Sequence, residues 1–206
     1  SIFLSKNIIF ECFFMQKLKF GTNKYDDKVL FVNPDVTYRE FKKHVCGQVE
    51  EFLKSKCENV VLFGDNYFDF SVNFFSAVFA QKNIYLITDK TRLKQLDFEY
   101  ILPQKSTPKS GEFYKNLNPK DIEIRFFTSG STGKPKTIIK TLYNLEVEAQ
   151  STADEFNIHE GEVVASTTSF SHSFGIAFGF ILSFYADLRI NQKKIEFPEQ
   201  FDVVGD

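Results

Sequence analysis

Short apolar runs alternate with helical periodicities along most of the chain. Residues 29–32 and 60–63 are apolar runs of strand length, and apolar side chains recur at three- and four-residue spacing from Tyr38 onward. Thr37 and Glu40 have the spacing of a capping box at the start of that helix. Further strands are expected at 84–87, 122–126, 163–165 and 188–190, and further helices near 67–78, 141–156 and 172–185. This order predicts an α/β fold with largely parallel sheets and helices on both faces.

A polar stretch with three prolines interrupts this order between residues 103 and 120. Proline, glycine and serine are typical of loops, because they set the backbone outside regular elements. The sequence therefore predicts an N-terminal α/β subdomain over residues 1–102, a polar loop or linker over 103–120, and a further α/β segment over 121–206. We expect the last segment to be an incomplete part of the same large domain.

Composition is that of an ordinary globular protein, with 206 residues, 43% hydrophobic and 25% charged. A net charge of −2 and the absence of a basic stripe argue against a nucleic-acid partner. The uncharged run at 169–186 contains four serines and His172, and its apolar part is shorter than the roughly 20 residues that a bilayer requires. We therefore expect no membrane span and a cytoplasmic location.

The segment from Phe126 to Lys136 reads FFTSGSTGKPK, and six of its residues in a row are glycine, serine or threonine. Glycine lets backbone amides approach a ligand closely, hydroxyls add donors, and Lys134 and Lys136 add positive charge. Ile122 and Ile124 alternate with charged residues, so the segment follows a strand. A strand that leads into such a loop is typical of nucleotide-phosphate binding. The predicted phosphate contacts of the 121–206 segment come from Thr128, Ser129, Gly130, Ser131, Thr132, Gly133 and Lys134.

Two kinds of phosphate loop have to be distinguished here. The Walker pattern of kinases and other NTPases requires a glycine where counting from Gly130 places Pro135, so that class is disfavoured. The segment instead resembles the signature of the adenylate-forming ligases, which include acyl- and aryl-CoA synthetases. That signature is an aromatic residue, Thr-Ser-Gly-Ser/Thr-Thr-Gly, any residue and Pro-Lys, and the chain matches it from Phe127 to Lys136.

A second segment of the chain resembles the same family. Residues 169–175 read SFSHSFG, close to a family pattern of Pro-x-x-His-x-x-Gly followed by an apolar helix. His172 and Gly175 match, whereas Ser169 stands where proline is usual and Asp187 stands where glycine is common. The resemblance places His172 beside the carboxylate substrate and makes Lys136 and His172 the catalytic candidates. The two other histidines, His44 and His159, have no such context and are expected to be solvated.

The resemblance covers about residues 29–190 and is to the N-terminal portion of these ligases. It implies ATP-dependent activation of a carboxylic acid to an acyl adenylate with release of pyrophosphate. The acyl group then passes to a thiol, that of CoA or of the phosphopantetheine arm of an acyl carrier protein. ATP and Mg²⁺ are the implied cofactors. Local similarity favours a subgroup that activates fatty or aryl acids for carrier proteins, as in fatty acid metabolism, but the residues specify neither the acid nor the acceptor.

Several family elements are not found in residues 191–206. In the family, a magnesium-holding glutamate, a ribose-binding aspartate and a C-terminal domain with a catalytic lysine follow this point. We therefore expect the 206-residue chain by itself not to complete adenylation. The alternative is a non-catalytic nucleotide-binding or interaction module that has kept the loop without the rest of the ligase.

Overall fold

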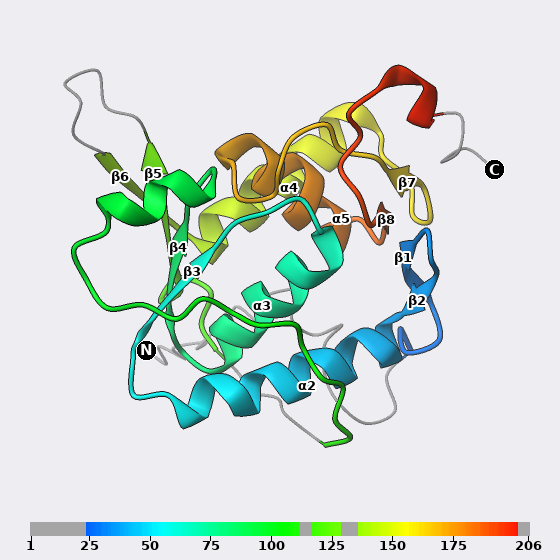
Figure 1. Cartoon of the computed structure of the whole chain (residues 1–206). Helices are drawn as coiled ribbons and strands as arrows, with labels where there is room; N and C mark the ends of the chain where they lie inside the picture. The colour runs from blue at the N-terminus through cyan, green and yellow to red at the C-terminus, as the bar shows by residue number, and fades with distance from the viewer. Residues whose placement is uncertain (1–23, 112–116, 129–135, 202–206) are drawn as a thin grey trace, which may run out of the picture.

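The computed structural model describes residues 24–111, 117–128 and 136–201, which form two four-stranded sheets with helices packed between and around them (Figure 1). The first sheet has the order β2-β1-β8-β7, with β1 at Val29–Val32, β2 at Val36–Thr37, β7 at Val163–Val164 and β8 at Arg189–Asn191. The second has the order β3-β4-β5-β6, with β3 at Asn59–Leu62, β4 at Asn83–Leu86, β5 at Glu123–Thr128 and β6 at Lys136–Thr141.

Both sheets are mixed and mainly parallel. In the second sheet β3, β4 and β5 run parallel and only β6 is antiparallel. In the first sheet β8 pairs in parallel with both β1 and β7, while β2 is antiparallel to β1. The predicted largely parallel α/β fold is therefore confirmed. Because β4 precedes the 103–120 segment and β5 follows it, this stretch connects neighbouring strands of one sheet; the domain boundaries themselves stay a prediction.

The helices begin where the sequence supplies capping side chains. The α2 helix (Tyr38–Lys54) starts with the predicted Thr37–Glu40 capping box, and α4 (Leu142–Phe156) starts with a second one at Thr141 and Asn144. The Asn66 side chain caps α3 (Tyr67–Phe79) by accepting from the Asp69 amide. Each cap satisfies backbone amides that have no partner within the helix. The remaining helical segments are η1 at Lys90–Gln95, η2 at Gly175–Ile181, α5 at Leu182–Tyr185 and η3 at Pro198–Phe201.

Phenylalanine dominates the core where α3 meets η2 and α5, between the two sheets in Figure 1. Phe180 of η2 is fully buried, and its ring centroid lies 5.0 Å from that of Phe74 and 5.5 Å from that of Phe75. Most of these rings meet edge to face, the geometry that aromatic pairs prefer. Other fully buried members of this cluster are Phe31, Phe41, Tyr67, Phe170 and Phe184.

Residues 102–111, which we refer to as the strap, cross the outer side of α2 (green in Figure 1). The Lys109 amide donates to the Lys43 carbonyl of α2 at 3.0 Å, and the Lys109 ammonium pairs with the Glu50 carboxylate at 2.5 Å. Gly47 permits this approach, since a Cβ atom there would lie 1.9 Å from the Thr107 carbonyl oxygen. The polar stretch predicted as a loop or linker is therefore partly docked against a helix.

Replacing Gly47 with alanine is expected to destabilise the protein by about 1–3 kcal/mol, because the strap backbone must move away. Helix propensity alone predicts the opposite sign, a gain of about 1 kcal/mol for glycine to alanine. The midpoint of urea unfolding decides between the two. The control is Lys43→Ala, whose side chain is exposed on the same helix and which is expected to leave the midpoint unchanged. A Gly47→Ala midpoint at or above that of the unmodified protein contradicts the close approach.

Candidate functional site

The predicted phosphate loop connects two paired strands. β5 ends at Thr128 and β6 begins at Lys136, and these two residues are the last register pair of the antiparallel ladder. The prediction that the segment joins two strands is confirmed. Ser129, Gly130, Ser131, Thr132, Gly133 and Lys134, the remaining predicted contacts, lie outside the described residues. Because β5 also pairs in parallel with β4, the loop follows the carboxyl edge of parallel strands, where ligands of α/β proteins usually bind.

His172 lies on a turn and not on a helix. The sequence predicted a buried helix over residues 172–185, and the helical run begins one residue later, at Ser173, before it continues as the π-helical η2 from Gly175. The His172 amide donates to the Ser169 carbonyl at 3.0 Å, which closes a turn before the helix. Gly175 is required here, since a Cβ atom there would lie 2.0 Å from the Ser169 carbonyl oxygen. The turn leaves the His172 side chain exposed at the helix entrance.

The imidazole of His172 is oriented by its own turn. The Phe174 amide donates to His172 Nδ1 at 3.3 Å. An accepting Nδ1 in a neutral imidazole leaves the ring proton on Nε2. His172 therefore presents an N–H donor on the side of the ring that faces away from its own backbone.

The structure brings the two sequence motifs to one pocket of about 120 Å³. His172 lines one side and Phe126 and Phe127 of β5 line another. Thr88, from the segment that connects β4 to η1, and Arg92 of η1 complete the wall. The remaining lining residues are Ser171 and Ser173. Residues more than 40 positions apart in sequence thus meet next to the strand that leads into the predicted phosphate loop.

Thr88 and Arg92 are site residues that the sequence analysis did not select. Thr88 lies two residues after the end of β4, and Arg92 is in η1, which the Asp89 side chain caps by accepting from the Thr91 amide at 2.8 Å. The available signal was their position after a buried strand next to β5, because neighbouring parallel strands end at the same edge. Arg92 adds a guanidinium to a pocket whose other lining side chains are aromatic, hydroxyl or imidazole.

His44 and His159 lie away from this pocket. His159 is exposed, as predicted, and its Nε2 lies 3.1 Å from the Asn157 amide nitrogen. The prediction for His44 is wrong: its ring is half-buried, bonds the strap through Ser106 Oγ at 2.8 Å and packs edge-on against Phe68. Burial lowers the pKa of His44, so the ring is mainly neutral at pH 7.

The described residues contain neither a clustered metal-ligand set nor a membrane-spanning helix. Within residues 24–111, 117–128 and 136–201, no group of three histidine, cysteine, aspartate or glutamate side chains is placed to hold a metal ion. These ranges therefore supply no cluster of that kind for the implied Mg²⁺. Nor does this part contain a helix that combines the length and the apolarity needed to cross a membrane.

Comparison with known proteins gives the family. Residues 75–191, more than half of the chain, match the family model described as AMP-binding enzyme. The chain belongs to this family. The matched range includes both the predicted phosphate loop and the His172 turn, and the predicted resemblance to adenylate-forming ligases is confirmed. No curated protein matches the sequence of this AMP-binding family member.

Solved structures of several ligases share the fold of this AMP-binding family member. A variant of E. coli MenE with bound OSB-AMS matches with a TM-score of 0.69 at 15% identity, over 88% of this chain and 46% of that one. ATP-bound MatB from Rhodopseudomonas palustris matches with a TM-score of 0.66 at 13% identity, over 94% and 47%. The anthranilate CoA ligase AuaEII in complex with anthranoyl-AMP matches with a TM-score of 0.65 at 14% identity, over 90% and 46%. The chain spans a little less than half the length of these proteins.

Proposed function

We propose that the full-length protein activates a carboxylic acid with ATP to an acyl adenylate and then transfers the acyl group to a thiol. Membership in the AMP-binding family supports the class of reaction. The single observation that carries the proposal for this chain is the pocket in which His172 meets the end of β5. A carboxylate-binding group and the strand that leads into the predicted phosphate loop have to be neighbours for an acid to reach ATP.

The chemistry divides between the two motifs. A carboxylate oxygen of the substrate attacks the α-phosphorus of ATP, the bond to the bridging oxygen of the β-phosphate breaks, and pyrophosphate leaves. The Gly/Ser/Thr segment and Lys136 would bind the pyrophosphate part, where negative charge increases in the transition state. The Nε2–H of His172 would hold the carboxylate in the pocket. A thiol then attacks the acyl carbon and AMP leaves.

The acid and the acceptor are proposed only as classes. MatB was solved with ATP, and AuaEII is an anthranilate CoA ligase solved with anthranoyl-AMP, so proteins of this fold bind ATP and activate a carboxylic acid. For this protein we propose a fatty or aryl acid, with CoA or the phosphopantetheine arm of a carrier protein as acceptor and a role in fatty acid metabolism. We also propose that it acts in the cytoplasm.

The test is acid-dependent exchange of labelled pyrophosphate into ATP by the full-length protein, measured over a panel of fatty and aryl acids. The expected result is exchange that requires one class of acid and stops when that acid is left out. Exchange-inactive protein that still binds ATP contradicts the ligase and supports the alternative of a non-catalytic nucleotide-binding module. The 206-residue chain assayed by itself is expected to show no exchange.

A further inference from the structure

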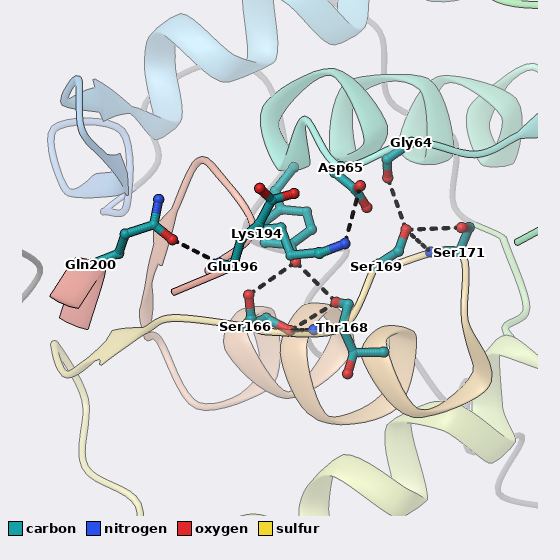
Figure 2. A network of polar contacts seen from close by, with 10 residues as sticks. Gly64, Asp65, Ser166, Thr168, Ser169, Ser171, Lys194, Glu196 and Gln200 are labelled. Carbon is teal, nitrogen blue, oxygen red and sulfur yellow. Dashed lines mark hydrogen bonds and ion pairs between the residues drawn. The ribbon is translucent and has the colours of Figure 1, made fainter. Parts of the chain in front are cut away.

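The Ser169 side chain joins the His172 turn to the loop after β3 (Figure 2). Its hydroxyl donates to the Gly64 carbonyl at 2.9 Å, and Ser171 Oγ lies 3.0 Å from Ser169 Oγ. The Ser171 amide also donates to Ser169 Oγ, at 3.4 Å. One side chain thus bonds a different element of the fold and the turn that it belongs to.

The start of α3 holds the residues just before Ser169. Tyr67, the first residue of α3, donates its hydroxyl to the Thr168 carbonyl at 2.9 Å and contacts the Ser166 carbonyl at 3.2 Å. Its ring stacks on Phe170 at a centroid distance of 3.8 Å. Burial raises the pKa of Tyr67 to about 12, so the phenol remains a donor at physiological pH. Residues 166–170 are therefore fixed from one side by α3 and the turn that precedes it.

A third segment completes the support of this loop. The Lys194 ammonium pairs with the Asp65 carboxylate at 3.4 Å (Figure 2). The Tyr67 amide donates to the Gln192 carbonyl at 3.0 Å. The loop that accepts the Ser169 hydroxyl is thus held in place by Gln192 and Lys194, which follow β8. Gly64 itself has a φ of 114°, a conformation that glycine adopts readily and other residues do not.

His172 is positioned through Ser169. The His172 amide donates to the Ser169 carbonyl, and that carbonyl lies against Gly175 at the start of η2. Fixing the Ser169 side chain therefore fixes the backbone from which the imidazole projects. Proline at this position would restrict the turn through its ring; serine achieves the restriction through a hydrogen bond to another element.

We infer that Ser169 is a positioning residue, whose hydroxyl holds His172 in the pocket formed with Phe126 and Phe127. The inference rests on the proposed function for its consequence: the acid is bound in a productive place only when the turn is anchored. Loss of the hydroxyl would displace the imidazole without removing it. A displacement of this kind raises the KM for the acid or lowers kcat and leaves ATP binding intact, because the phosphate loop belongs to another pair of strands.

The experiment compares Ser169→Ala with Ser169→Thr, which retains the hydroxyl. Ser151→Ala is the matched control, since Ser151 is exposed on α4 and bonds only the Val147 carbonyl of its own helix among its observed contacts. Hydrogen exchange of the His172 and Phe174 amides is measured in the 206-residue chain. Pyrophosphate exchange is measured in the full-length protein, with separate KM values for the acid and for ATP.

Ser169→Ala is expected to raise amide exchange in the turn by about tenfold and to lower kcat/KM for the acid by about tenfold to 100-fold. The KM for ATP is expected to stay within about twofold of that of the unmodified protein. Ser169→Thr restores both readouts, and Ser151→Ala changes neither. Amide hydrogen exchange that is unchanged in Ser169→Ala overturns the inference. So does a Ser169→Thr variant that loses as much kcat/KM for the acid as Ser169→Ala does.

The two proposals fail separately. If the unmodified full-length protein shows no acid-dependent pyrophosphate exchange, the proposed function is wrong, and the amide-exchange measurement still decides whether the Ser169 hydroxyl anchors the turn. If the protein is active and Ser169→Ala loosens the turn with no change in kcat/KM for the acid, the positioning role is wrong and the proposed function stands. General unfolding of Ser169→Ala would show as faster amide hydrogen exchange in β3 to β5 as well. In that case Ser169→Thr decides whether the hydroxyl is required, because it retains the hydroxyl.

Discussion

Replacing Lys136 with alanine is expected to lower acid-dependent pyrophosphate exchange by the full-length protein about 100-fold or more. Lys136 is exposed at the first position of β6, directly across the ladder from Thr128, so the variant removes a charge at the boundary of the predicted phosphate loop. Loss of one donor that stabilises charge in the transition state typically costs about 100-fold to 1,000-fold in rate. Because no core contact is lost, the midpoint of urea unfolding is expected to remain unchanged.

The matched control for Lys136 is Lys56→Ala, an exposed lysine between α2 and β3. This variant removes the same charge at a position distant in sequence from the predicted phosphate loop, and it is expected to keep full activity. A double change of Thr128 and Ser129 to alanine is expected to reduce exchange strongly as well, since it removes two hydroxyl donors. Full exchange activity in the Lys136 variant would contradict the assignment of the 128–136 segment to phosphate binding.

Phe180→Ala is expected to destabilise the fold by about 3–5 kcal/mol, the usual cost of removing a buried phenylalanine ring. The side chain is fully buried and joins η2 to α3 and α5 through the rings of Phe70, Phe75 and Phe184 at centroid distances of 5.2–5.5 Å. Whole domains are stable by only about 5–15 kcal/mol, so this single change is a large fraction of the total. Equilibrium urea unfolding followed by circular dichroism measures the difference.

Phe178→Ala is the control for Phe180, because it removes the same ring from the same π-helical segment. Its side chain is 37% exposed, and its ring partner is Phe174, which is itself 58% exposed. The expected cost is about 1 kcal/mol, the magnitude of one aromatic pair at the surface. Equal losses for the two variants would show that the cluster around Phe180 does not hold the helices together.

Local features of this chain were predictable from the sequence. The Thr37–Glu40 capping box and the start of α4 near Thr141 depend on residues within four positions of one another. The loop between β5 and β6 follows from alternation and composition on both sides of it. The alternation of strands and helices along the chain also predicted the fold class, since a helix between two strands favours their parallel pairing.

Contacts between distant segments were not predictable in the same way. The Ser169 hydroxyl bonds a carbonyl 105 positions earlier, and nothing near Ser169 in sequence indicates that partner. The docked strap depends on the absence of a side chain at Gly47. Sequence alone identifies this glycine only as a residue of low helix propensity. His172 is exposed because it lies in the turn one residue before the helical run, and apolar periodicity does not locate the start of a helix to a single residue.

The parallel pairing of β1 with β8 determines when each half of the molecule can fold during synthesis. Asn33, just after β1, bonds the Asn191 side chain 158 positions later. At about 5–20 residues per second, a ribosome needs about 8 to 30 s to make that intervening chain. The β3 to β6 sheet closes over a shorter span of sequence and can form while β1 is still waiting. During this interval Phe31 of β1 can already pack on Phe41 of α2 and Phe68 of α3, but the strand edge that later pairs with β8 has no partner. An unpaired strand edge favours aggregation, so the nascent first sheet is exposed to misassembly until β8 has been made.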